Sequence, residues 1–454
     1  MTPDPNDVRR WDVEHLWHPF TQMAEYAATE PLVFVRGEGH DLIDDRGRRY
    51  FDATSALWCN LFGHRVPEID AAVRDQLDRH AHSTLLGATH PAAAELARRL
   101  VEIAPPGLTR VFLSDNGATA VEAALKLAFQ YRLLTRGEAA AREATFLAIE
   151  NAYHGDTLGA AAVGGVALFH ETFRPILLPT LRVPAPYCYR CPQGRSSPDC
   201  PIDRAEDVEA ALEREGGRVC AVILEPGVQA AAGMIPLPTG YLSRVAAAAR
   251  RHGALLILDE VATGFGRTGT MFACQKEAVT PDLLCLAKGL TGGYLPVAAT
   301  LATEAVYQPF LGRYEDYRHF FHGHTYTGNP LGCAAALATL RLLVDRRIVE
   351  DVAPKSDVLR AALAPLTAHP HVGDIRVTGL MAGIELVADR AAKTPFPPSR
   401  RLGHRIGLAM RERGVFARPL GDVMVLMPPL TTTHEELRRL GSTLQAAIVE
   451  VLGA

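Results

Sequence analysis

The spacing of apolar and polar residues divides the chain into parts with different predicted elements. Apolar and polar residues alternate around glycine-rich turns between about residues 33 and 54, which predicts a small antiparallel meander. Helical spacing follows in residues 67–81 and again in 91–105, where Pro105 and Pro106 end the pattern. The first 35 or so residues show no regular period, and we expect them to form an irregular arm.

The pattern changes between about residues 110 and 300, where short apolar runs alternate with helical stretches. The runs are RVFLSD, TFLAIEN, LRVPAP, VCAVILEP, ALLILDE and LLCLAK. Such alternation predicts a mainly parallel sheet that is covered on both faces. After residue 330 come a long Ala/Leu-rich helix, a strand in GLMAGIELV, strand-like VFARP and VMVLMPP, and two further helices. This tail is predicted to be an α+β unit of its own.

Composition excludes several classes of protein. The chain has 454 residues, 48% of them hydrophobic, which is ordinary for a globular protein and excludes a disordered one. Its 47 Lys and Arg against 51 Asp and Glu give a net charge of −4, so no overall charge favours nucleic acid or an anionic membrane. No apolar run approaches the roughly 18 residues that span a bilayer. We therefore expect a cytoplasmic protein with reduced cysteines.

The most informative residues are Asp259 and Lys288. Each follows an apolar run that reads as a buried strand, and the carboxyl ends of such strands are where ligands collect in open α/β sheets. Burial lowers the pKa of an amine and makes it the nucleophile that a Schiff base needs. A nearby carboxylate suits a protonated heterocycle nitrogen, so the pair matches pyridoxal phosphate. A structural ion pair between the two residues is the alternative.

A second candidate is the segment 114–132, in which a polar loop with Gly117 leads into a strong helix. Thr119 and Glu122 have the spacing of a capping box. Unpaired N–H groups and the helix dipole make such a helix start a good phosphate site, although many Ala-rich helices begin in this way.

Three single residues are weaker candidates. Tyr153 follows a predicted strand, where its ring could stack on a flat cofactor. Thr325 lies in a polar loop before a helix, and its hydroxyl could bind a phosphate. Arg418 follows the short strand in VFARP, where its guanidinium could bind a substrate carboxylate in bidentate fashion. As a core tyrosine, a loop threonine and a surface arginine, the three would be unremarkable.

Two groups suggest a metal without matching a standard site. His319, His322 and His324 lack an acidic or cysteine partner at standard spacing, so we predict no metal there. Cys188, Cys191 and a third cysteine, Cys200, resemble a zinc knuckle but lack a fourth ligand. A zinc-stabilised binding protein is thus the alternative from a different class, and the sequence offers it little else.

In order and spacing, these motifs resemble the class III (omega) aminotransferases, which have the type I pyridoxal-phosphate fold. The resemblance covers nearly the whole chain and is most specific in LILDEVATGFGRTG followed by CLAKGLTGG. It implies a large α/β domain with a mainly parallel sheet of the seven-stranded type over residues 76–335. A smaller α+β domain would comprise residues 336–454, and residues 1–75 would supply an arm and part of that small domain.

The resemblance also implies roles for individual residues. Lys288 would bind the cofactor covalently and then move a proton, while Asp259 would keep the ring nitrogen protonated. The other cofactor contacts would be Tyr153 and Val261 on the two ring faces, Gly117 and Ala118 on the phosphate, Glu225 near the phenolic oxygen, and Thr325 on the phosphate of a partner subunit. The last contact implies a homodimer with shared sites.

Within this class, LWHPFTQM (residues 16–23) and GVFARPLGDVMVLMPP are similar to the 7,8-diaminononanoate synthases of biotin biosynthesis. This implies that 8-amino-7-oxononanoate accepts the amino group and that Arg418 binds its carboxylate. The remaining implied substrate residues are Trp58, Asp156, Arg267, Gly323 and His324. Another omega-aminotransferase, acting on diamines or ω-amino acids, is the alternative.

The amino donor stays open between S-adenosylmethionine and lysine. Members that use S-adenosylmethionine often carry two tryptophans where this chain has Leu57 and Trp58, and tyrosines where it has Phe20 and Val425. They also tend to carry proline at the position of His324. The segments YCYRCPQG and HGHTYTGN are more similar to the lysine-using branch.

Overall fold

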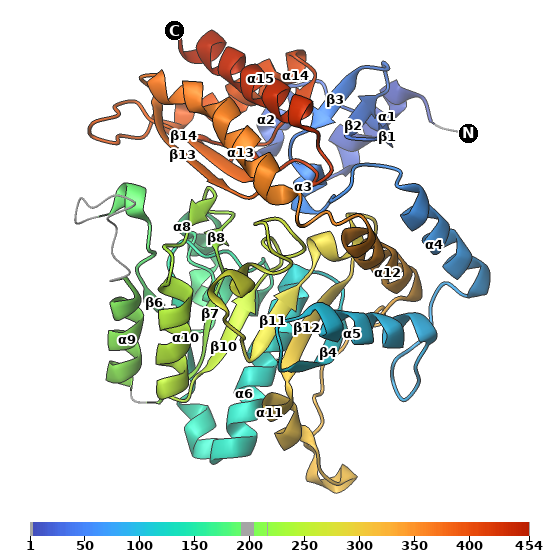
Figure 1. Ribbon diagram of the computed structural model, residues 1–454, viewed down its shortest axis with the longest axis vertical. Coiled ribbons are helices and arrows are strands. Elements are labelled where there is room, and N and C mark those ends of the chain that lie inside the picture. Colours follow the sequence, from blue (N-terminus) through green and yellow to red (C-terminus); the bar gives the residue numbers. More distant parts are fainter. Residues whose placement is uncertain (1–2, 192–203, 216, 454) are drawn as a thin grey trace.

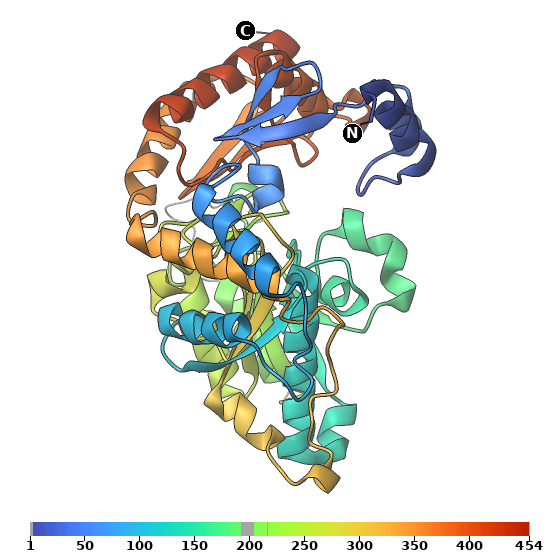
Figure 2. The ribbon, with the colours of Figure 1, turned by 90° about the vertical axis from the view of Figure 1, so that its right-hand side faces the viewer.

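The structure, a computed structural model, describes residues 3–191, 204–215 and 217–453. In Figure 1 a larger lower part surrounds one sheet, and a smaller upper part contains both ends of the chain. Figure 2, turned by 90°, shows the same division, with the N-terminal helices standing to one side of the upper part.

The large part is built on a seven-stranded sheet in the order β4-β12-β11-β10-β7-β5-β6. Its strands are β4 (Leu108–Ser114), β5 (Thr145–Ile149), β6 (Leu181–Val183), β7 (Val219–Leu224), β10 (Leu255–Asp259), β11 (Leu283–Leu286) and β12 (Ala298–Thr303). The neighbours from β11 to β6 are parallel, and β12 is antiparallel to both β11 and β4. All six predicted strands are confirmed, whereas β12 was not predicted.

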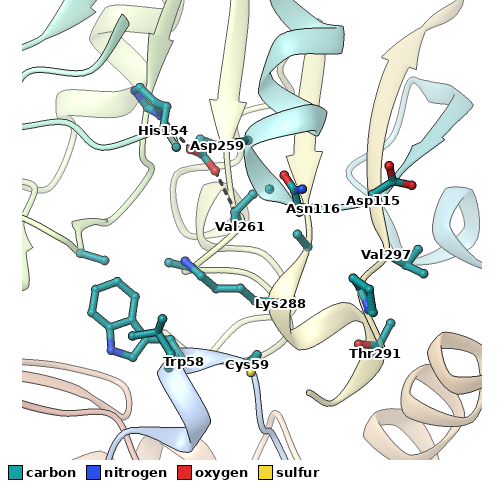
Figure 3. Close-up of a pocket in the computed structure, with 18 of the residues that line it drawn as sticks. Trp58, Cys59, Asp115, Asn116, His154, Asp259, Val261, Lys288, Thr291 and Val297 are labelled. Atoms are coloured by element: carbon teal, nitrogen blue, oxygen red, sulfur yellow. Dashed lines mark hydrogen bonds and ion pairs between the residues drawn. The ribbon is translucent and has the colours of Figure 1, made fainter. Parts of the chain in front are cut away.

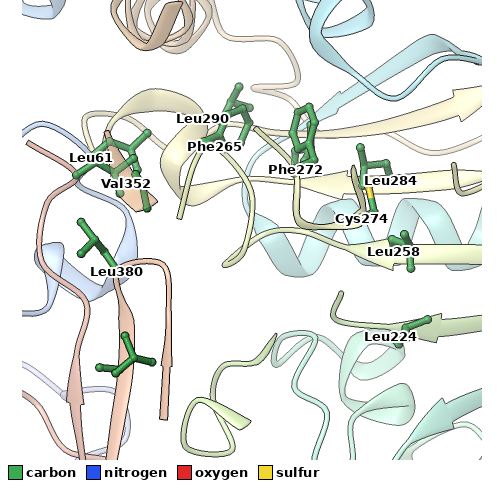
Figure 4. Close-up of a cluster of buried hydrophobic side chains, with 14 of the residues drawn as sticks. Leu61, Leu224, Leu258, Phe265, Phe272, Cys274, Leu284, Leu290, Val352 and Leu380 are labelled. Atoms are coloured by element: carbon green, nitrogen blue, oxygen red, sulfur yellow. The ribbon is translucent and has the colours of Figure 1, made fainter. Parts of the chain in front are cut away.

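The two faces of this sheet are buried in separate hydrophobic clusters. Leu256 and Leu258 of β10 belong to the cluster that includes helix α10, and Leu255 and Ile257 belong to the cluster beneath α6. Figure 4 shows Leu258 with its register partners Leu224 and Leu284 on the first face. Each fully buried leucine stabilises the fold by about 1.5–3 kcal/mol, so the apolar runs that predicted the strands also hold the sheet between its helices.

Most predicted helices are confirmed, but the N-terminal arm is not irregular. The helices are α1 (Pro5–His15), α2 (Met23–Ala27), α4 (Pro67–Arg79), α5 (Pro91–Ile103), α6 (Gly117–Arg142), α7 (Leu158–Val163), α8 (Ala167–His170), α9 (Arg204–Glu215), α10 (Tyr241–Arg251), α11 (Glu304–Tyr307), α12 (Pro330–Asp345), α13 (Val352–Leu363), α14 (Leu402–Glu412) and α15 (His434–Leu452). Helix α1 forms because the Asp4 side chain accepts a hydrogen bond from Asn6 N and Pro5 begins the helix. Among helices in the described residues, none has the length and apolarity needed to cross a bilayer.

The smaller part joins the two ends of the chain through a sheet in the order β1-β2-β3-β15. The smaller part contains β1 (Phe34–Glu38), β2 (Asp41–Asp44), β3 (Arg49–Asp52), β13 (Val372–Thr378), β14 (Met381–Leu386), β15 (Val415–Phe416) and β16 (Val423–Leu426). Strands β1 to β3 form the predicted antiparallel meander, and β15 pairs with β3 in parallel, with Phe416 opposite Asp52. This pairing agrees with an N-terminal contribution to the small domain, while the boundaries at residues 75 and 335 stay predictions.

A third buried cluster connects the large and small parts. It includes Trp58, Ala262, Val425, Met427 and residues of the hairpin formed by β8 (Val228–Gln229) and β9 (Ile235–Pro236). The two parts are thus held together by apolar contact at the edge where β10 and β11 end.

Arg267 adds a polar connection between the same parts. It is 1% exposed, and its guanidinium donates hydrogen bonds to the carbonyl oxygens of Asn60 and Pro428. Its own carbonyl oxygen accepts a hydrogen bond from Leu380 N. At Gly379, which has φ +58°, an added Cβ would lie 2.1 Å from that oxygen. The turn between β13 and β14 therefore needs glycine for both its conformation and its close approach.

We predict that Gly379→Ala lowers the free energy of unfolding by about 3 kcal/mol, because overpacking adds to the cost of a left-handed alanine. Gly421→Ala is the matched control, since Gly421 also has φ +58° but nothing within 4 Å of an added Cβ. It should cost only about 1 kcal/mol. Urea unfolding monitored by circular dichroism measures both, and equal losses would contradict the proposed contact.

Candidate active site

The carboxyl ends of β5, β7, β10 and β11 open into a cavity of about 760 Å³. Most of the predicted site residues line it: Trp58, Gly117, Ala118, Tyr153, Asp156, Glu225, Asp259, Val261 and Lys288. Parallel strands end at a common edge, so residues far apart in the sequence meet there.

Lys288 follows β11 and begins a short 3₁₀ helix, Lys288–Thr291. Its Nζ lies 5.0 Å from the centre of the Trp58 ring. Burial lowers the pKa of the Lys288 amine below its usual value, and the negative charges of Asp259 and Glu225 partly oppose this effect. The amine is therefore neutral, and nucleophilic, at a lower pH than an exposed lysine.

Asp259, the last residue of β10, is 4% exposed and holds its carboxylate through two contacts. Oδ2 lies 2.7 Å from Nδ1 of His154, and Oδ1 accepts a hydrogen bond of 3.0 Å from Val261 N (Figure 3). The next residue, Glu260, accepts hydrogen bonds from Ala273 N and Cys274 N. Of Asp259 and Glu260, only Asp259 lines the cavity, because successive side chains along an extended chain point to opposite faces.

His154 was not predicted from the sequence. It is buried, lies on the cavity wall and contacts Asp259 through Nδ1, while its Nε2 has no hydrogen-bond partner among the described residues. The signal that could have identified it is its place beside Tyr153 after β5. A histidine at that strand end lies within reach of a carboxylate two strands away in the sheet order.

Glu225 follows β7 and is also buried. Its carboxylate accepts hydrogen bonds from Tyr153 N and Ala230 N, at 3.1 and 3.0 Å. Burial raises the pKa of Glu225 to about 7, with the charge of His154 acting in the opposite direction. Glu225 thus connects two loops of the cavity wall and titrates near neutral pH.

Helix α6 begins at the cavity with Gly117. Its N-cap is Asn116, whose side chain accepts from Thr119 N while the Thr119 hydroxyl lies 3.1 Å from Asn116 N. The predicted capping box of Thr119 with Glu122 is therefore wrong. The Glu122 carboxylate instead accepts hydrogen bonds from Gly159 N and Ala160 N, because its side chain points from the helix toward α7.

Tyr153 is fixed by contacts on its hydroxyl and on its ring. The hydroxyl donates a 2.6 Å hydrogen bond to Asp156, and the ring stacks on His170 with 6.1 Å between centroids. Burial and the Asp156 carboxylate both raise the pKa of Tyr153 above its usual value. The residue is thus a neutral aromatic surface on the cavity wall.

The other predicted site residues do not line the cavity within the described part of the chain: Arg267, Gly323, His324, Thr325 and Arg418. His324 Nδ1 lies 2.7 Å from the Asp115 carboxylate, which places its loop beside the start of α6. Arg267 instead donates to the two carbonyl groups described above, and sequence alone could not reveal these contacts.

Arg418 lies on the segment after β15, close enough to the cavity wall for its charge to lower the pKa of Tyr153, against the larger effect of burial. It is exposed, and its guanidinium carbon lies 5.9 Å from the ring centre of Phe20 in the N-terminal arm. Phe20 contacts Phe169 edge to face at 5.3 Å, and Phe169 contacts Tyr153 at 5.9 Å. A row of aromatic rings thus connects the arm to the cavity wall.

The histidine and cysteine candidates form no metal site in the described residues, where no group of three possible ligands is present. Cys188, in the 3₁₀ helix Cys188–Arg190, is disulfide-bonded, so the expectation of reduced thiols is wrong for this residue. Sequence spacing does not show which cysteines approach one another. Cys200 lies outside the described residues.

These features fit pyridoxal phosphate. An added Cβ at Gly117 would lie 2.6 Å from Val261 Cγ1, so the helix start approaches the cavity as closely as only glycine allows. The first N–H groups of α6 have no partner within the helix and can bind phosphate. Asp259, fixed by two contacts, suits a ring nitrogen, and Lys288 suits an aldehyde.

Comparison with known proteins agrees with this site. The family model for class III aminotransferases matches residues 23–448. An adenosylmethionine-8-amino-7-oxononanoate aminotransferase from Nitratidesulfovibrio vulgaris is 54% identical over 98% of this chain and 82% of its own. A crystal structure of the enzyme of that name from Methanocaldococcus jannaschii has a TM-score of 0.93 and 44% identity, covering 99% of this chain and 100% of its own.

A further solved structure is an amine transaminase from an uncultivated Pseudomonas species in its pyridoxal-phosphate-bound form. It has a TM-score of 0.92 and 35% identity, and the match covers 96% of this chain and 99% of that one. The extent of these matches shows that this chain has the type I fold and belongs to the class III aminotransferases, which use pyridoxal phosphate.

Proposed function

We propose that this aminotransferase converts 8-amino-7-oxononanoate to 7,8-diaminononanoate in biotin biosynthesis, with S-adenosylmethionine as the amino donor. The observation that carries the proposal is the meeting of Lys288 and Asp259 in one cavity whose rim carries an exposed arginine, Arg418. The names of the similar enzymes support both the acceptor and the donor. We also propose that the enzyme is cytoplasmic.

Lys288 and Asp259 divide the chemistry between them. When bound, pyridoxal phosphate supplies an aldehyde for the amine and a ring that accepts electrons from the substrate carbon. Lys288 Nζ, whose pKa is lowered by burial, would take a proton from the donor carbon in the first half-reaction and deliver a proton to the acceptor carbon in the second. Asp259, held by His154 and Val261 N, would be the acidic partner of the ring nitrogen.

The remaining proposed contacts follow from their places in the site. Gly117 and Ala118 would bind the phosphate, Val261 and Tyr153 would enclose the ring, and Glu225 would lie near the phenolic oxygen. Trp58 and Asp156 line the cavity and would contact substrate. Arg267 would act on the substrate site only through the segments that it holds.

Arg418 is proposed to bind the substrate carboxylate. Its guanidinium forms no hydrogen bond or ion pair among the described residues and lies over the Phe20 ring, so its donors are available to a ligand. An arginine and a carboxylate form two parallel hydrogen bonds, which orient as well as bind.

The alternative is an omega-aminotransferase for diamines or ω-amino acids. The likeness to the amine transaminase favours it, because that protein has the same fold at 35% identity. The two functions differ at Arg418, since a simple diamine has no carboxylate for it to bind.

We also propose a homodimer with shared sites, to which Gly323, His324 and Thr325 contribute across the interface. Thr325 is exposed beside the cavity edge, and its carbonyl oxygen is held by His82. The neighbouring surface is strongly apolar, with Phe321 74%, Tyr317 65% and Ile176 62% exposed. Such a patch favours burial against a second copy.

The purified enzyme loaded with pyridoxal phosphate should form 7,8-diaminononanoate from 8-amino-7-oxononanoate and S-adenosylmethionine, measured by mass spectrometry. Lysine, offered separately, should give no product, although it is the donor that some sequence features favoured. If the cofactor is aminated by S-adenosylmethionine and then transfers the amino group to pyruvate, but not to 8-amino-7-oxononanoate, the alternative function is favoured.

Lys288→Ala should abolish product formation while the protein keeps binding the cofactor without a borohydride-reducible link.

Arg418→Met should raise KM for 8-amino-7-oxononanoate by about 10- to 100-fold with little change in kcat, because a charged hydrogen bond contributes about 1.5–3 kcal/mol. Arg400→Met is the matched control, since Arg400 also lies over an aromatic ring, that of Phe396. It should leave KM unchanged. Equal KM values for the wild type and Arg418→Met would exclude the proposed carboxylate contact.

Phe321→Glu should weaken the dimer by at least about 100-fold, because it places a charge in an apolar interface. Sedimentation velocity across a concentration series measures this change. Val35→Glu is the control, since Val35 of β1 is also an exposed apolar residue, at 61%. A monomeric wild-type enzyme with full activity would contradict the shared site.

A further inference from the structure

Directly after β3 the chain forms a left-handed helical turn, α3 (Ser55–Trp58), without any glycine. The φ angles are 49° at Ser55, 49° at Ala56, 75° at Leu57 and 72° at Trp58. Residues with a Cβ are disfavoured in this conformation and adopt it singly rather than in series. Four in succession therefore need strong contacts from outside the turn.

Asp52 provides the first of these contacts. Its carboxylate is fully buried, and Oδ1 accepts hydrogen bonds from the N–H and the hydroxyl of Thr54, each at 3.2 Å. Oδ2 accepts a 2.8 Å hydrogen bond from Ala56 N and lies 3.2 Å from Nε2 of His64. One side chain thus binds the entry and the middle of the turn.

Ser55 provides the second contact, which reaches the C-terminal part of the chain. Its hydroxyl donates a 2.6 Å hydrogen bond to the carbonyl oxygen of Met427, and Met427 N donates in turn to Ala53 O at 2.8 Å. The turn is closed by Trp58 N, which donates to Thr54 O at 2.7 Å. The handedness of the turn is therefore fixed from two directions.

The turn determines where the Trp58 ring lies. Trp58 is only 7% exposed, belongs to the cluster between the two parts, and faces Lys288 across the cavity (Figure 3). Because Trp58 is itself one of the four left-handed residues, relaxation of the turn would move its ring away from Lys288. Asp52 and Ser55 are not part of the cavity wall, whereas Trp58 is.

We propose that Asp52 and Ser55 are positioning residues, which hold the left-handed turn that sets Trp58 over Lys288 and thereby fix the width of the substrate site. They touch neither the cavity nor Lys288, so they act through the turn, whose residues Ala56, Leu57 and Trp58 line the cavity and whose Trp58 ring faces Lys288. The effect on substrate rests on the proposed function, while the position of the ring does not.

The first test follows the Trp58 ring without any substrate or cofactor. The chain has three tryptophans, and in full-length protein with Trp11→Phe and Trp17→Phe the emission comes from Trp58 alone. Asp52→Asn should shift this emission to longer wavelength and at least double its quenching by acrylamide. Ser55→Ala, which removes a single hydrogen bond, should give a smaller change in the same direction.

Asp44→Asn is the matched control. Asp44 is also a buried carboxylate of this sheet and accepts hydrogen bonds from Arg46 N and Arg48 N, but it holds a different turn. It should lower the melting temperature and leave the Trp58 emission unchanged. Unchanged emission in folded Asp52→Asn would overturn the proposal, and if that variant does not fold, unchanged emission in Ser55→Ala would do so.

The second test asks whether Asp52 acts through Trp58 during turnover. Asp52→Asn and Trp58→Ala should each lower kcat/KM for the amino acceptor at least tenfold, mainly by raising KM. The double variant should be no worse than Trp58→Ala, since a ring that is absent cannot be misplaced. If the loss of kcat/KM in the double variant equals the product of the two single losses, the proposal is wrong.

An enzyme that does not turn over the proposed acceptor at all would contradict the proposed function. The emission measurements would still decide the role of the turn.

Discussion

The pairing of β10 with β11 is the constraint on which the site depends. Asp259 lies opposite Cys285 in this parallel pair, and Lys288 follows three residues later, so both charges emerge at one buried edge. Burial lowers the pKa of the Lys288 amine, and the charge of Asp259 partly opposes this effect. Two further donors, His154 and Val261 N, satisfy the Asp259 carboxylate, which would otherwise be costly to bury.

The same pairing makes the chemistry sensitive to register. Asp259 and Glu260 are adjacent acids with different tasks, since the first lines the cavity and the second binds the loop at residues 273 and 274. Burial raises the pKa of Glu260 to about 7. A shift of β10 by one residue would place the Glu260 side chain in the cavity and leave the loop without its acceptor.

The sequence predicted the parts of the fold and site that depend on local pattern. Six strands and the residues that end them were found because each strand is a compact apolar run. Strand β12 was missed because Ala298–Thr303 is rich in alanine and lacks a run of β-branched residues. His154 was not predicted, and neither were the contacts of Arg267, because the partners lie far away in sequence: Asp259 for the first, and Asn60 and Pro428 for the second.

The pairing of β3 with β15 explains why recognition and chemistry come from different parts of the molecule. These two parallel strands join distant regions of the chain, and their carboxyl ends deliver the turn with Trp58 and the segment with Arg418 to the same rim. Lys288 and Asp259 come from the large sheet, whose register does not depend on that pairing. A small displacement of the β3–β15 edge would therefore change the contacts to substrate while leaving the cofactor residues in place. Because the two sets of residues are held separately, substitutions near Trp58 and Arg418 can change which substrate binds without moving Lys288 and Asp259.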